Sequence, residues 1–426
     1  MSNFNKYKFD ELYVMSSGIS SKPIQAGHGA PFVSFSTVFN NYFLPDRLVD
    51  LMDSSVKEQE IYSVKKGDLL LTRTSETIGE LGMSCVAIKD YPKATFSGFV
   101  KRLRPLQSDK TYDKYMGFYL RSKSFRKIIT NNAIMTLRAS LNEKIFSYLN
   151  LYLPDFETQK NIGDFLYLLN SKIELNNRIN AELESMAKTL YDYWFVQFDF
   201  PNEKGKPYKT SGGKMVWNVE LKREIPEGWE DGNFGKYANL KGGFAFKSSW
   251  WTEKGLPVIK IKDINENYTL SIENCSCVNS DKYDKAKNYE AFPGDVVIAM
   301  TGATVGKYGI VPKTNTSILV NQRVGLFNLG KNPMLKLPFL INSLNQDYFR
   351  ETVFVIASGA AQPNISSDQI DAIPLVIPEK MIVDLFNSKL SSFYETIINN
   401  IQENQKLSSL RDWLLPMLMN GQVRVG

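Results

Sequence analysis

Among the residues that could do chemistry, the segment Gly302–Gly309 (GATVGKYG) superficially suggests a phosphate-binding loop. A loop of that kind needs four residues between its glycines, followed by Lys and then Ser or Thr. Here three residues separate Gly302 from Gly306, and Tyr308 follows Lys307. The spacing therefore favours a β-turn that shapes a loop over a nucleotide site.

Histidine and cysteine are too few for a catalytic or metal centre. The single histidine, His28, excludes an HExxH zinc site and relays built on a defined histidine pair, so we interpret it as a solvated loop residue. Cys85, Cys275 and Cys277 cannot form a disulfide framework, and Cys-x-Cys without partners is a poor metal site. A methyltransferase would need a Pro-Pro-aromatic turn, and the chain has no Pro-Pro pair. We predict no catalysis, no cofactor and no metal in this chain.

Residues suited to nucleic-acid recognition are more numerous. The formal charge of +6 and the pI near 8.8 are compatible with a nucleic-acid partner. Arg and Lys position phosphates, while Arg on guanine and Asn or Gln on adenine read base edges. A solvated surface charge is the alternative for each single residue. We expect DNA contacts from Lys22, Arg73, Arg102, Arg138, Lys247, Lys262, Lys307, Gln322, Arg323, Gln362 and Asn364.

An internal repeat relates the two halves of the chain. KKGDLLLTRTSETIGELG (65–82) matches FPGDVVIAMTGATVGKYG (292–309), and LNEKIFSYLNLYLP (141–154) matches ISSDQIDAIPLVIP (365–378). In the loop ASGAAQPNIS, Gln362 stands where the first half has Arg138. Matched scaffolds with different side chains at one place suit two domains that read two different sequences.

Each half combines short strand-like runs and a helical run with one long helix. The predicted fold class is α+β, with two pseudo-repeated mixed α/β domains separated by two long helices. We predict a domain at 1–156, a long helix at 157–196, a linker at 197–229, a second domain at 230–378, a second long helix at 379–420 and a tail at 421–426.

The two long helices are expected to pair as an antiparallel coiled coil. Apolar and Asn positions from Ile162 to Trp194 alternate in steps of four and three, the 3.5-residue period of a two-helix seam. Asn176 and Asn180 recur in the second helix as Asn400 and Asn404. Antiparallel pairing would bring these asparagines together, where they would fix the register; independent surface asparagines in two amphipathic helices are the alternative.

The sequence predicts a soluble, cytoplasmic protein without a membrane segment. The N-terminal stretch MSNFNKYKFDELYVM has no apolar core like that of a signal peptide. No run of about 18 apolar residues occurs.

The chain resembles the specificity subunit of a type I restriction–modification system over nearly its whole length. The residues that carry the resemblance are LYDYWFVQFDFP (190–201), GKPYKTSGGKMVW (205–217), IPEGWE (225–230), GDVVIAMTGATVGK (294–307), SGAAQPNIS (358–366) and LRDWLLPMLMNGQV (410–423).

This resemblance implies two target-recognition domains, each reading one part of a split, asymmetric sequence in double-stranded DNA. It implies two methyltransferase (M) subunits that use S-adenosylmethionine, and restriction/motor (R) subunits that use ATP and Mg, so that these cofactors belong to the partners. Docking of the partners is expected at aromatic residues near the helix ends, Tyr193, Phe195 and Trp413, with packing in the core as the alternative for each. The alternatives are a two-headed protein-interaction scaffold without DNA readout, and a nuclease or methyltransferase with unfamiliar motifs.

Overall fold

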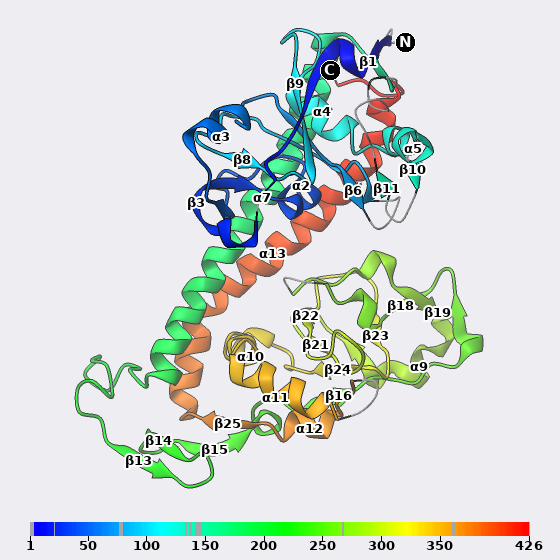
Figure 1. The fold of residues 1–426 in the computed structure, drawn as a ribbon. Coiled ribbons are helices and arrows are strands. Elements are labelled where there is room, and N and C mark those ends of the chain that lie inside the picture. The colour runs from blue at the N-terminus through cyan, green and yellow to red at the C-terminus, as the bar shows by residue number, and fades with distance from the viewer. Residues whose placement is uncertain are drawn as a thin grey trace. The chain divides into compact units, whose positions relative to one another are not determined.

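The computed structural model describes residues 4–20, 22–75, 80–132, 134–135, 139–140, 147, 149–265, 268–359 and 363–425 (Figure 1). The chain divides into two compact units. Unit 1 comprises Met1–Ile173 and Lys406–Gly426, and unit 2 comprises Glu174–Gln405. Each unit therefore contains one mixed α/β domain together with part of both long helices, whereas the sequence-based boundaries set the helices apart from the domains.

Unit 1 is built around a four-stranded antiparallel sheet with the order β2-β9-β5-β7. Strand β5 has the sequence LLLT, and all four residues are buried because both faces of the sheet are covered. The strands of unit 1 are β1 (Asn5–Lys8), β2 (Tyr13–Ser17), β3 (Ala26–Val33), β4 (Leu51–Met52), β5 (Leu69–Thr72), β6 (Thr74–Ser75), β7 (Ser84–Val86), β8 (Thr95–Phe96), β9 (Val100–Pro105), β10 (Ile134–Met135), β11 (Ala139–Ser140) and β12 (Asn150–Leu153). Its shorter helices are α1 (Phe9–Leu12), α2 (Phe35–Asn40), α3 (Val56–Ile61), α4 (Asp113–Tyr119) and α5 (Lys123–Asn132).

Unit 2 contains a four-stranded sheet, β16-β24-β21-β22, and a five-stranded sheet, β17-β19-β18-β23-β20. Its strands are β13 (Met215–Asn218), β14 (Arg223–Pro226), β15 (Glu230–Asn233), β16 (Leu240–Gly242), β17 (Trp251–Thr252), β18 (Leu256–Ile259), β19 (Ser276–Val278), β20 (Glu290–Ala291), β21 (Val296–Ala299), β22 (Tyr308–Ile310), β23 (Ile318–Val320), β24 (Val324–Phe327) and β25 (Pro374–Ile377). Its shorter helices are α8 (Phe234–Tyr237), α9 (Tyr283–Ala286), α10 (Leu337–Leu344), α11 (Asp347–Ala357) and α12 (Ser367–Asp371).

The repeat seen in the sequence is also present in the packing of the two units. In unit 1, the first residue of α1, Phe9, packs on Phe125 of α5 with ring centroids 5.9 Å apart. In unit 2, the first residue of α8, Phe234, packs on Phe349 of α11 at 4.8 Å. The strand before each phenylalanine pairs antiparallel with the strand before a long helix, β1 with β12 and β15 with β25.

The long helices are α7 (Phe156–Tyr191) and α13 (Lys380–Met419). One π-helical turn, Asp192–Val196, extends the first of them. In unit 1, Ile162 and Leu166 of α7 share a core with Leu415 and Leu418 of α13. In unit 2, Ala187, Tyr191 and Trp194 share a core with Phe386, Leu390, Tyr394 and Ile397. In both units early residues of one helix meet late residues of the other, as in an antiparallel pair.

The prediction that residues 197–229 form a linker was wrong. They contain the antiparallel hairpin β13–β14, and Phe198, Phe200, Ile225 and Trp229 are buried in the core of unit 2. Phe200 stacks between Tyr208 and Trp229, with ring centroids 4.6 and 4.9 Å away. The Gly, Pro and Lys content of this stretch suggested a solvated connector, but burial of its aromatic side chains determines its structure.

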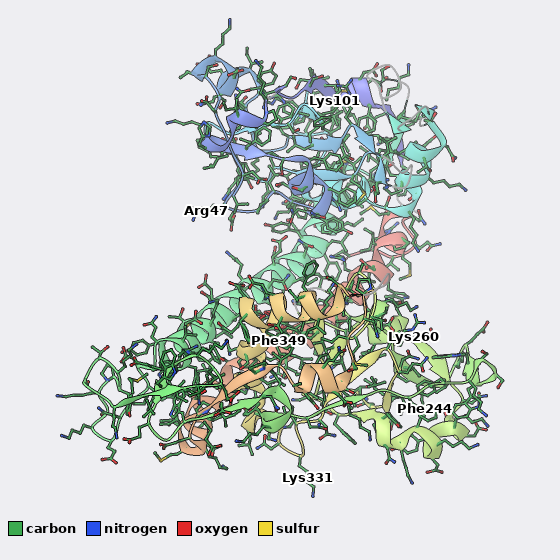
Figure 2. The ribbon with its side chains drawn as sticks, turned by 60° about the horizontal axis from the view of Figure 1, so that its bottom comes forward. Arg47, Lys101, Phe244, Lys260, Lys331 and Phe349 are labelled. Atoms are coloured by element: carbon green, nitrogen blue, oxygen red, sulfur yellow. The ribbon has the colours of Figure 1, made fainter. Side chains whose placement is uncertain are left out.

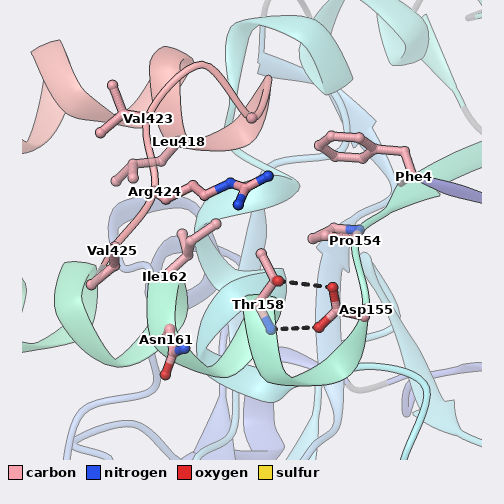
Figure 3. A pocket seen from close by; sticks show the side chains of 11 residues that line it. Phe4, Pro154, Asp155, Thr158, Asn161, Ile162, Leu418, Val423, Arg424 and Val425 are labelled. Carbon is pink, nitrogen blue, oxygen red and sulfur yellow. Dashed lines mark hydrogen bonds between the residues drawn. The ribbon is translucent and has the colours of Figure 1, made fainter. Parts of the chain in front are cut away.

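The first described residue and the C-terminal segment meet at the start of α7. Phe4, Ile162, Leu418 and Val423 line a cavity of about 200 Å³, and the guanidinium of Arg424 also lines it (Figure 3). Asp155 caps α7 by accepting hydrogen bonds of 2.8 Å from the backbone N–H and the hydroxyl of Thr158. Residues near both ends of the sequence thus pack together around the start of α7 in unit 1.

Candidate nucleic-acid interface

Several predicted DNA contacts of unit 2 are brought together where β21 ends. The backbone N–H of Met300 donates to Arg323 O at 3.0 Å, and Ile365 N–H donates to Met300 O at 2.9 Å. Gly302 N–H donates to Pro363 O, and Gln322 N–H to Phe244 O, both at 2.9 Å. We call the segments Met300–Lys307, Asn321–Arg323, Phe244–Lys247 and Pro363–Ile365 the unit 2 loop cluster. It carries the exposed residues Lys247, Gln322, Arg323 and Asn364, and the half-buried Lys307.

Unit 1 contains the same arrangement of backbone hydrogen bonds. Arg73 N–H donates to Phe99 O at 2.9 Å, as Met300 does to Arg323, and Gly98 N–H donates to Ile19 O at 2.8 Å, as Gln322 does to Phe244. These bonds define a unit 1 loop cluster formed by Ile19–Ser20, Arg73 and Ser97–Phe99. Arg73 is exposed in it, and Lys22, three residues after Ile19 in the chain, is exposed as well. Equivalent positions carry different side chains, since Phe99 stands where unit 2 has Arg323.

Arg102 does not lie on an exposed loop as the sequence suggested. Only 8% of its surface is accessible, because it lies on β9, the strand between β2 and β5. Its guanidinium donates to the carbonyl oxygens of Ile61 and Ser63 and lies 5.3 Å from the ring centre of Phe96. Burial lowers the pKa of this guanidinium. We therefore correct the prediction: Arg102 supports the domain from inside.

The repeated Gly-Asp motif also has a structural role. Asp68 is fully buried, and its carboxylate accepts two hydrogen bonds of 2.7 Å from Arg104. Asp68 Oδ2 also accepts from Lys65 N–H at 2.7 Å, and Asp295 Oδ2 likewise accepts from Phe292 N–H at 2.9 Å. Each Asp thus closes the tight turn before a central strand of its unit.

Three of the predicted DNA contacts remain. Lys262 of unit 2 is exposed. Arg138 and Gln362, the residues expected to occupy equivalent places in the two recognition loops, lie outside the described residues.

Sequence reasoning did not identify the aromatic rings that lie beneath two basic residues of unit 2, Lys241 and Lys260. The Lys260 ammonium lies 3.6 Å from the ring centre of Trp251, and Lys241 lies 4.7 Å from that of Tyr289. Figure 2 shows Lys260 in the same unit as Phe244, whose ring stacks on Trp250 at 5.7 Å. Burial lowers the pKa of Lys260. The sequence signal that could have predicted these contacts is the alternation of Lys and Trp residues in the stretch 241–262.

The aromatic residues expected to dock partners differ in exposure. Trp413 is 65% exposed and Tyr193 is 36% exposed. Phe195 is only 6% exposed, because it packs against Phe339 and Phe386 with both ring centres 4.9 Å away. The prediction for Phe195 is corrected: this residue is part of the core.

The seam asparagines pair as the heptad pattern predicts. Asn176 Nδ2 donates to Asn404 Oδ1 at 2.9 Å, and Asn400 Nδ2 donates to Asn180 Oδ1 at 2.8 Å. Asn176 and Asn180 are 0% and 8% exposed. Their role in fixing the register stays a prediction.

The described residues form neither a metal-binding cluster nor a membrane-spanning helix. No group of three or more His, Cys, Asp or Glu residues among the described residues is placed to hold a metal ion. Within the same residues, no helix combines the length and the apolar character needed to cross a membrane.

The comparisons with known proteins agree with one another. The family model for the type I restriction modification DNA specificity domain matches residues 1–185 and 226–409. The HindI specificity subunit of Haemophilus influenzae is 25% identical over 480 residues, covering 99% of this chain and 100% of that protein. The MjaIX specificity subunit of Methanocaldococcus jannaschii is 24% identical over 382 residues, covering 88% of this chain and 82% of that protein.

The fold is similar to a solved structure. The crystal structure of the type I restriction–modification S subunit from M. genitalium matches with a TM-score of 0.58 at 14% identity, covering 98% of this chain and 96% of that one. Since the family model matches most of both repeats, the chain belongs to the type I restriction–modification DNA specificity subunits, non-catalytic proteins whose catalytic partners are the M and R subunits.

Proposed function

We propose that this specificity subunit reads a split, asymmetric target in double-stranded DNA, with one domain for each half-site and the helix pair setting the gap between them. The observation that carries this proposal is the pair of equivalent loop clusters. They share a backbone hydrogen-bond pattern but present different side chains, such as Phe99 and Arg323. Equivalent scaffolds with different exposed groups suit recognition of two different base sequences.

The contacts that we propose in unit 2 fall into two kinds. Gln322, Arg323 and Asn364 are exposed and have the donor and acceptor patterns that read base edges in the major groove. Lys247, Lys262 and Lys307 supply positive charge for phosphates. In unit 1 we propose Lys22 and Arg73 as contacts. Arg138 and Gln362 remain proposed readers on the strength of their equivalent positions in the repeat.

We further propose that two M subunits and the R subunits assemble on this chain. S-adenosylmethionine would then be held by the M subunits, and ATP with Mg by the R subunits. Tyr193 and Trp413 have exposed rings near helix ends, which supports a docking role, since aromatic residues are enriched at protein interfaces.

Methylation mapping tests this function. The chain is expressed with its M subunits, and methylated adenines are mapped in the DNA of those cells. The expected result is one bipartite motif with a fixed gap. Arg323→Ala should change the bases accepted in one half-site, and Arg73→Ala those accepted in the other. Lys331→Ala, which removes an exposed charge of unit 2 outside the loop cluster, is the control and should leave both half-sites unchanged.

Three outcomes would contradict the proposal. If one variant relaxed both half-sites together, the assignment of one domain to each half-site would fail. If the purified chain bound target DNA with no dependence on salt, or not at all, a scaffold for protein partners would explain the architecture better, because several phosphate contacts require a steep salt dependence. Methylation or cleavage by the purified chain alone would favour an enzyme.

A further inference from the structure

A cavity in unit 2 lies directly beside the loop cluster. Its volume is about 550 Å³, and it opens between the Gly302–Lys307 loop and helix α11. The lining residues that matter here are Tyr268, Gly306, Lys307, Tyr308, Asn345 and Arg350. The cavity therefore has one wall in common with the proposed interface, and the opposite wall is formed by residues that the sequence analysis did not identify.

The charge of the lining is one-sided. Lys307 and Arg350 both line the cavity, and no Asp or Glu occurs among the described lining residues. Arg350 Nη2 donates to Asn345 Oδ1 at 3.0 Å, which leaves other N–H groups of the guanidinium for a ligand. No described residue pairs with the Lys307 ammonium. Because two cations and no described carboxylate line this cavity, it favours binding of an anionic ligand.

The hydrogen bonds around Arg350 hold the wall of the cavity in one arrangement. Tyr268 and Tyr308 stack with ring centres 5.0 Å apart and planes inclined by 16°. Tyr308 Oη donates to Asn345 Oδ1 at 2.7 Å, while Asn345 Nδ2 donates to Tyr268 Oη at 2.9 Å. Tyr268 has a φ of 60°, a strained value for a residue with a side chain, and such values concentrate at binding sites. Burial keeps the pKa of Tyr308 well above its usual value, so its hydroxyl stays a donor.

The Gly302–Lys307 loop, which forms the other wall of the cavity, lies close against helix α11. Gly306 has a φ of 84°, and a Cβ built on it would come within 3.1 Å of Val353 Cγ1. A larger residue there would push the loop away from α11 and move Lys307, the next residue. Gly306 thus lets the loop approach α11 closely enough for Lys307 to line the same cavity as Arg350.

We infer that this cavity binds one phosphodiester of the DNA backbone next to the half-site read by unit 2, with Lys307 and Arg350 as its anion ligands. This rests on the proposed function. Arg350 and Lys307 are cations that only donate, and no Asp or Glu occurs among the described lining residues, so the site suits an acceptor-rich anion. The contact therefore adds affinity and position without reading sequence.

The inference is tested with the full chain and a fluorescent duplex that contains the mapped target. Arg350→Gln and Lys307→Gln should each weaken binding about tenfold and reduce the slope of log affinity against log salt by about 1, as loss of one phosphate contact does. Lys331→Gln is the matched control and should leave affinity and slope unchanged. Lys307→Arg keeps the charge and should restore most of the affinity. Thermal unfolding of each variant confirms that it folds.

Three outcomes would overturn the inference. One is an unchanged salt slope in both Gln variants. The second is a changed methylation motif, which would make Lys307 or Arg350 a base reader. The third concerns the source of the phosphate: if deoxyadenosine monophosphate or inorganic phosphate bound through Arg350 while duplex binding was unaffected, the ligand would be a soluble phosphate. Failure of the wild-type chain to bind duplex at all would refute the proposed function, whereas intact wild-type binding with unaffected variants would refute only this site.

Discussion

Asn176 and Asn404 face each other across the helix pair, with a hydrogen bond of 2.9 Å from Asn176 Nδ2 to Asn404 Oδ1. Asn176 is fully buried, and its own Oδ1 accepts no hydrogen bond from the described residues. Asn404 Nδ2 in turn donates to Asn177 Oδ1 at 2.8 Å. A buried amide that is only partly satisfied costs stability relative to leucine, so a role in register explains the pair better than a role in stability.

Replacing one partner of this pair should cost more than replacing both. Asn176→Leu takes the amide donor away from both Asn404 Oδ1 and Glu403 Oε2, and we expect a loss of about 1–3 kcal/mol in the free energy of unfolding. The double variant Asn176→Leu/Asn404→Leu should recover most of that loss. Urea unfolding of the wild-type chain, the single variants Asn176→Leu and Asn404→Leu, and the double variant measures the coupling between the two amides. Glu182→Ala, at an exposed position of the same helix, is the control. Strictly additive costs would show that the two amides are not coupled.

The number of heptads in the helix pair should set the gap between the half-sites. Seven residues inserted after Ile173 and seven after Gln405, where the two compact units divide, lengthen each helix by about 10 Å. We expect the gap in the methylation motif to grow by about three base pairs at 3.4 Å per pair, with both half-site sequences unchanged.

An insertion of a different length is the matched control. Five residues at the same two places break the heptad phase between the two parts of each helix, so the apolar seam no longer runs continuously from one unit into the other and this variant should unfold at lower denaturant concentration. If the seven-residue variant folds normally but its methylation motif keeps the original gap, helix length does not set the spacing between the half-sites.

The architecture could be predicted because it depends on periodicity and repetition. The four-three spacing identified the seam, and the recurrence of Asn176 and Asn180 as Asn400 and Asn404 identified the pairing, since both signals are contained in residue order alone. The hairpin in residues 197–229 was missed because its polar composition hides a few buried aromatic residues, among them Phe200 and Trp229.

The site was harder to predict because exposure is a property of the folded sheet. Lys22 and Arg73 are exposed while Arg102 is buried, although all three are cations next to predicted strands. Arg350 was missed because it lies on a helix far along the chain from Lys307, and only the fold places both on one cavity.

Arg102 and Arg73 should therefore respond differently to the same substitution. Arg102→Ala removes the buried guanidinium that donates to the carbonyl oxygens of Ile61 and Ser63 and lies on Phe96, so we expect a loss of about 1–3 kcal/mol in unfolding free energy. Arg73→Ala, at an exposed position, should stay within about 0.5 kcal/mol of wild type and weaken DNA binding instead. Denaturant unfolding and duplex binding of both variants check this. Equal loss of stability would contradict the assignment of Arg102 as the structural residue.

Glu184 should make the stability of unit 2 depend on pH. Burial on α7 raises the pKa of its carboxyl from an ordinary 4.5 to about 7, and Tyr394 of α13 lies within range of its charge. Between pH 4.5 and 7 the folded chain holds a proton that the unfolded chain has lost, so this group lowers stability progressively as the pH rises.

Glu184→Gln should remove this dependence. At pH 8 the variant should be more stable than wild type by about 1–3 kcal/mol, because the glutamine avoids burying a charge. Below pH 4.5 the wild-type carboxyl is neutral in both states, so the two proteins should unfold alike. Urea unfolding between pH 4 and 8 measures the difference, and Glu182→Gln, at an exposed position of the same helix, should show none. A gain that persisted undiminished at pH 4 would mean that packing, and not the buried charge, distinguishes the two side chains.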